Sequence, residues 1–205
     1  DKIIAGILTP TSGKIYLDGE DITNLSITER AKRGVSFAFQ QPVRFKGITV
    51  HDLISLAAGK EISIGEACNY LSEVGLCARD YINREVNASL SGGELKRIEI
   101  ATVMAKDHKV SIFDEPEAGI DLWSFSMLVK QFEKIHREKS ESLVLISHQE
   151  RIIRMADRIM VVRDGKIAEC GSRDEILPKL FMDGISCATC LDGEGGDSDE
   201  AGCSY

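Results

Sequence analysis

Two short motifs in the stretch 90–121 carry residue types suited to phosphate chemistry. The first is a turn of small residues that opens a predicted helix, and it comprises Ser91, Gly92, Gly93 and Glu94. The start of a helix leaves backbone N–H groups free to face an anion. The turn is therefore a candidate site for a phosphate group.

The second motif is a short apolar strand that ends in two acids. The run 110–113 predicts the strand, and Asp114 and Glu115 follow it directly. Because adjacent strand residues point to opposite faces, the two carboxylates can have different roles. Asp114 can face a metal ion while Glu115 faces the space beyond it, and Pro116 stops the strand there.

Each motif also has an ordinary structural explanation. Ser91 could simply cap a helix, with Glu94 stabilised by the helix dipole. Two acids after a strand are often a solvated turn, and short motifs match by chance often enough that neither decides a function alone. Their occurrence together, in this order and around a helix, favours the phosphate interpretation.

The composition is that of an ordinary globular protein, with 205 residues, of which 43% are hydrophobic and 28% charged. A chain of this length buries one substantial core. No apolar run is long enough to span a bilayer, and no basic and apolar leader is present, so we expect a cytoplasmic protein. The net charge is −8, and Lys and Arg are dispersed, which argues against a nucleic-acid partner.

Short apolar runs alternate with helical segments along the chain, as in α/β proteins. Strands are predicted at 35–39, 110–114 and 143–146, and the last of them is expected to be buried. Helices are predicted at 51–58, 65–74, 122–135, 150–156 and 174–180, and hairpins at 14–22 and 159–170. Gln40 follows the first strand, and His148 follows the third at its carboxyl end, where ligands bind in open α/β sheets. Taken alone, either side chain is more often simply solvated.

The small-residue turn, the helix and the strand that ends in Asp114, Glu115 and Pro116 together resemble the ATP-binding cassette (ABC) ATPases. The resemblance implies an α/β fold of the P-loop NTPase (RecA-like) class with an inserted helical subdomain, and it implies ATP and Mg²⁺ as cofactors. Its expected parts are the rest of an N-terminal lobe at 1–42, a helical subdomain at 43–107, a RecA-like core at 108–180 and an acidic tail at 181–205.

The resemblance also implies roles for single residues. Gln40 would lie in the Q-loop and reach the metal ion and the attacking water, and Asp114 would hold Mg²⁺. Glu115 would orient and polarise the water, while His148 of the H-loop would contact the γ-phosphate. These four residues would make the hydrolytic site.

A second set of residues would act on a partner copy of the chain. The family's signature turn would contribute Ser91, Gly92, Gly93 and Glu94 to the nucleotide bound by the opposite subunit. Asp121 would lie in the D-loop and touch that subunit, although it also suits the N-cap of the following helix. A homodimer formed through ATP is therefore expected.

The phosphate-binding loop of the family, G-x-x-x-x-G-K-[ST], is not matched at any Gly-Lys pair. The motif needs its first glycine five residues before the glycine of each pair, and at the three pairs this position holds Leu8, Ile54 and Met160. Because the chain also begins with Asp1 and not Met, we expect this Walker A segment to precede Asp1. The chain as given is then expected to be inactive by itself.

The cysteines fall into two groups. Cys68, Cys77 and Cys170 are interpreted as buried, reduced thiols. Cys187 and Cys190 lie in the acidic tail, which we expect to be disordered, at a spacing found in zinc or iron–sulfur sites. A full structural site usually needs four ligands, so a flexible, reduced tail is the alternative.

Details within the family resemblance are similar to the SUF-system (SufC-type) ATPases, which drive iron–sulfur cluster assembly on a soluble scaffold. They lie at 39–43, 84–87, 94–100 and 147–151. Import and export ATPases more often end the signature with Gln and continue Ala-Arg-Ala-Leu, where this chain has Glu94 and Ala-Thr-Val-Met. A SUF scaffold is the leading partner and a membrane permease the alternative. The third possibility is a non-enzymatic chain that only binds partners or metal through its own tail.

Overall fold

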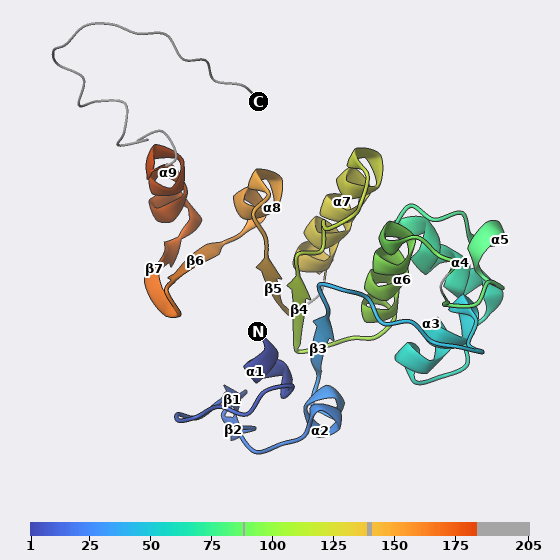
Figure 1. Cartoon of the computed structure of the whole chain (residues 1–205), viewed down its shortest axis with the longest axis horizontal. Coiled ribbons are helices and arrows are strands. Elements are labelled where there is room, and N and C mark those ends of the chain that lie inside the picture. The colour runs from blue at the N-terminus through green and yellow to red at the C-terminus, as the bar shows by residue number, and fades with distance from the viewer. Residues whose placement is uncertain (88, 139–140, 184–205) are drawn as a thin grey trace, which may run out of the picture. The chain divides into compact units, whose positions relative to one another are not determined.

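A three-stranded parallel sheet organises the larger of two compact units, Asp1–Met155, in this computed structural model, which describes residues 1–87, 89–138 and 141–183 (Figure 1). Its strands are β3 (Val35–Ala38), β4 (Val110–Asp114) and β5 (Ser142–Ile146), in that spatial order. The register pairs Ala38 with Phe113 and Asp114 with Ile146. The carboxyl ends of all three strands therefore lie at one edge of the sheet.

Two long helices complete the core around this sheet. They are α6 (Gly92–Met104) and α7 (Leu122–Glu138). The ring of Phe113 on β4 meets that of Phe132 on α7 edge-on, with centroids 4.9 Å apart. Such contacts need large apolar residues at helical spacing on α7. Phe125, Leu128 and Phe132 have this spacing and are buried.

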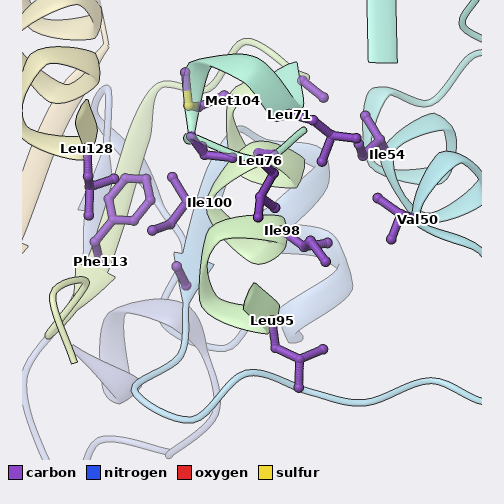
Figure 2. Close-up of a cluster of buried hydrophobic side chains, with 14 of the residues drawn as sticks. Val50, Ile54, Leu71, Leu76, Leu95, Ile98, Ile100, Met104, Phe113 and Leu128 are labelled. Carbon is purple, nitrogen blue, oxygen red and sulfur yellow. The ribbon is translucent and has the colours of Figure 1, made fainter. Parts of the chain in front are cut away.

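The same core continues into the helices that follow β3. These are α3 (Val50–Ala58), α4 (Ile64–Glu73) and the one-turn helix α5 (Ala78–Tyr81). Figure 2 shows Ile54, Leu71 and Ile98, which are fully buried in one hydrophobic cluster. Thr49 and Ser63 begin α3 and α4 with capping boxes, so the helix starts are set by local sequence.

A buried arginine holds the N-terminal elements together. They are α1 (Lys2–Ala5), the hairpin β1 (Tyr16–Leu17) and β2 (Glu20–Asp21), and α2 (Ile27–Lys32). Arg30 of α2 is 2% exposed and donates to the carbonyl oxygens of Ile3, Ile4, Thr23 and Leu25 at 2.6–3.0 Å. It thereby ties the end of α1 to the segment that leads into α2.

The second unit begins at Ala156, after the short helix α8 (Glu150–Met155). It contains the antiparallel hairpin of β6 (Arg158–Arg163) and β7 (Lys166–Ser172), followed by α9 (Arg173–Asp183). Asp164 and Gly165 at the turn both have positive φ, at 51° and 72°, as a two-residue hairpin turn requires.

Most predicted elements are confirmed, and three expectations are wrong. The strand at 143–146 is only half-buried, since β5 has a single neighbouring strand among the described residues and Val144 is 40% exposed. Cys77 and Cys170 are exposed thiols and not buried ones. The last helix, α9, continues to Asp183, three residues past the expected end at Leu180.

Several expectations are not tested by the fold. The subdomain boundaries at 42, 107 and 180 stay a prediction, and Cys187 and Cys190 lie outside the described residues. In the described part of the chain, no helix is both long and apolar enough to cross a membrane.

Candidate functional site

Side chains from all three strand ends meet at the carboxyl edge of the sheet. Gln40 follows β3, Glu115 follows β4, and His148 follows β5. Gln40 Nε2 donates a hydrogen bond of 2.7 Å to Glu115 Oε2, and His148 Nε2 lies 3.8 Å from Glu115 Oε1. The structure thus brings these three predicted residues together, with the Glu115 carboxylate in the middle.

Glu115 has an unusual backbone conformation, with φ at +45°. A residue with a side chain in this left-handed region costs on the order of 1 kcal/mol or more. Its N–H donates to Ile146 O at 2.9 Å, and its carbonyl accepts from Ala118 N–H at 3.0 Å. These bonds fix the turn after β4, and the carboxylate is left 31% exposed.

Glu117 joins this turn to the loop that carries His148. Ser147 Oγ donates to Glu117 Oε1 at 2.6 Å and accepts from Gln149 N–H at 3.0 Å. The chain on both sides of His148 is therefore tied down, while the imidazole itself is 89% exposed. Sequence reasoning missed Glu117, although an acid placed directly after the Asp-Glu-Pro motif was the available signal.

The residues at this edge fit a magnesium ion bound together with phosphate. Asp114 ends β4 next to Glu115, and the Gln40 amide donates through nitrogen, which leaves its oxygen for a cation. Mg²⁺ prefers oxygen ligands and is usually held by one or two carboxylates plus the phosphates of a substrate. In the described ranges, no group of three His, Cys, Asp or Glu side chains is arranged to hold a metal ion.

The signature turn is built as a capping box at the start of α6. Ser91 N–H donates to Glu94 Oε2 at 2.6 Å, and Glu94 N–H donates to Ser91 Oγ at 3.2 Å. The Tyr81 hydroxyl also donates to Glu94, and this bond, with those from Ser91, lowers the pKa of the Glu94 carboxyl. Glu94 therefore shapes the turn, while Ser91 and Gly92 remain exposed.

The D-loop packs directly against the signature turn. A Cβ added to Gly93 would overlap the carbonyl oxygen of Gly119, so only glycine allows this approach. Asp121 Oδ1 accepts from the N–H groups of Trp123 and Ser124 at 3.1 and 3.0 Å, and the hydrogen bonds from Ser124 lower its pKa. Asp121 is thus the predicted N-cap of α7, and its contact with a second subunit stays a prediction.

Comparisons with known proteins agree with this architecture. The family described as ABC transporter matches residues 2–118. An uncharacterised ABC transporter ATP-binding protein, MJ0035 of Methanocaldococcus jannaschii, is 36% identical over 82% of this chain and 69% of its own. The sulfate/thiosulfate import ATP-binding protein CysA of Mesorhizobium japonicum is 32% identical over 85% of this chain and 52% of its own, so the chain spans about half of that relative.

A solved structure is also similar to this one. It is a dimeric ATP-binding cassette, MJ0796, in a post-hydrolysis state bound to ADP and Pi. The TM-score is 0.73 at 23% identity, over 84% of this chain and 78% of the other, which establishes the fold. The chain belongs to the ABC transporter family and carries its ATPase domain, with the α/β fold of the P-loop NTPases.

The close approach of Gly93 to Gly119 predicts a difference between two neighbouring glycines. Gly93→Ala should lower the free energy of unfolding by about 1–3 kcal/mol, because the new methyl group must displace backbone. Gly92→Ala is the matched control, since its Cβ would meet nothing within 4 Å, and it should change stability by less than about 0.5 kcal/mol. Urea unfolding measures both, and equal effects would contradict the packing described for the two loops.

Proposed function

We propose that this chain is an ATP-hydrolysing subunit in which Glu115 orients and polarises the attacking water. The observation that carries the proposal is the hydrogen bond from Gln40 to Glu115, with His148 beside the same carboxylate. Phosphoryl transfer to water depends mainly on positioning and on charge stabilisation, for which such a cluster is suited.

Each residue at the site has a separate task in this proposal. Glu115 accepts a hydrogen bond from the water and aims its lone pair at the γ-phosphate. Gln40 holds the carboxylate in place, and His148 donates to the γ-phosphate. Asp114 and Gln40 would hold Mg²⁺, which would supply neutralisation of the phosphate charge.

The signature turn acts on the nucleotide of a second copy in this proposal. Ser91, Gly92 and Gly93 present the N-terminus of a 13-residue helix, where backbone N–H groups attract a phosphate. Asp121 lies in the loop that packs on this turn and would touch the same copy. ATP then stabilises the closed homodimer, because only that state makes both sets of contacts. The Walker A segment expected before Asp1 stays a prediction, as does inactivity without it.

A membrane permease is the partner we propose for this ATPase. The support is the similarity to a sulfate/thiosulfate import ATP-binding protein. The protein would act at the cytoplasmic face of the membrane, and closure of the dimer would move the permease through the segment 43–58. The substrate carried is a separate question.

A soluble SUF-type scaffold is the second candidate partner. It is favoured by Glu94 at the end of the signature turn, where import and export ATPases more often have glutamine. The Glu94 carboxylate accepts hydrogen bonds from both the Tyr81 hydroxyl and the Ser91 N–H, and it thereby holds the signature turn. The names of the relatives favour the permease, so the scaffold comes second.

The role of Glu115 predicts that Glu115→Gln in the full-length protein lowers kcat for ATP hydrolysis by about 100-fold or more, because an amide is a poor acceptor for the water proton. ATP binding should remain, and an ATP-bound dimer should accumulate. Phosphate release and size-exclusion chromatography with ATP measure the two effects. Glu150→Gln, on an exposed carboxylate of α8, is the control, and undiminished hydrolysis by the Glu115 variant would remove this residue from the mechanism.

A permease partner predicts that the trapped dimer is found in the membrane fraction of the cell. Full-length Glu115→Gln protein with ATP should be captured together with a permease from membrane fractions, and nucleotide-free protein serves as the control. Mass spectrometry identifies what is bound. Capture of a soluble iron–sulfur scaffold from the other fraction would overturn the permease and select the second candidate.

A further inference from the structure

A charged pair on α6, of which Lys96 is buried and Glu99 is 15% exposed, hydrogen-bonds to the backbone of the residue that precedes Gln40. Lys96 is 1% exposed, and its Nζ donates to the carbonyl oxygen of Phe39. Glu99 Oε1 accepts from the N–H of the same Phe39 at 2.9 Å. Lys96 Nζ and Glu99 Oε2 lie 3.3 Å apart, so one ion pair holds both polar backbone groups of Phe39.

The same pair reaches the strand that carries Glu115. Lys96 Nζ lies 3.3 Å from the carbonyl oxygen of Asp114, the last residue of β4. The pair therefore contacts the residue directly before Gln40 and the residue directly before Glu115. These are the two side chains joined by the 2.7 Å hydrogen bond at the site.

Stability alone does not account for this pair. Taking two charges out of water costs several kcal/mol, and apolar residues of similar size often stabilise a core at least as well. Burial raises the pKa of Glu99, against the opposing effect of the Lys96 charge. Glu99 Oε2 has no hydrogen bond within the described residues, so its contact there is the ion pair.

We propose that Lys96 and Glu99 are positioning residues that hold Gln40 against Glu115 and so link the signature helix to the hydrolytic residues of the same chain. The inference rests on the proposed ATP hydrolysis. Both residues lie in α6, the helix that Ser91 caps. A displacement of the signature turn therefore moves the helix as a rigid body and, through Lys96 and Glu99, the backbone of Phe39.

The test removes both charges in the full-length protein. Lys96→Met with Glu99→Met leaves no unpaired buried charge, so the unfolding temperature should stay close to that of the parent. The kcat for ATP hydrolysis should fall by about tenfold or more, with KM for ATP nearly unchanged, because Gln40 and Glu115 lose their alignment. Lys134→Met with Glu73→Met, which removes a half-exposed pair of 2.8 Å between α7 and α4, is the matched control.

A second readout is independent of turnover. In the nucleotide-free double variant, the Phe39 amide should exchange its hydrogen about tenfold faster than in the control, because its acceptor is gone. Unchanged kcat or unchanged exchange would overturn the inference. If the double variant does not fold, Glu99→Asp answers the same question, since it keeps the charge and draws the carboxylate away from Phe39. A parent protein without ATPase activity would instead refute the proposed function.

Discussion

The parallel register of β3, β4 and β5 is the constraint on which the rest of the site depends. Parallel strands end at the same edge of a sheet, so Gln40, Glu115 and His148 meet although they are far apart in sequence. The core contacts of Phe113 with Phe132 hold β4 in this register against α7. A strand shifted by one residue would turn Phe113 out of the core and Asp114 into it.

Several charged side chains near the site make hydrogen bonds that hold the neighbouring segments of chain in place. Lys96 and Glu99 hold Phe39, Glu117 holds the loop with Ser147, and Glu94 holds the signature turn. The hydrogen bonds that these groups make go mainly to backbone or hydroxyl partners. Hydrolysis of a phosphoanhydride needs groups held in place before the substrate arrives, and such contacts supply that rigidity.

The sequence predicted what depends on local pattern and on motif order. Apolar runs predicted the three strands, and the resemblance to ABC ATPases singled out Gln40, Glu115 and His148 after them. Lys96 and Glu99 were missed because charges on a helix are ordinarily on a solvated face, and only the packing of α6 on β3 buries them. The exposure of Cys77 and the half-burial of β5 were also missed, since both depend on which neighbours the fold provides.

The central claim is that each hydrolytic site combines Glu115 of one copy with the signature turn of another. Mixing full-length Glu115→Gln with full-length Ser91→Arg tests it most directly. Neither variant should hydrolyse ATP alone, yet a mixed dimer keeps one site with both residues intact. Random mixing should then restore about a quarter of the parent activity. No recovery, in dimers shown to be mixed, would contradict the claim and place both residues in one chain's site.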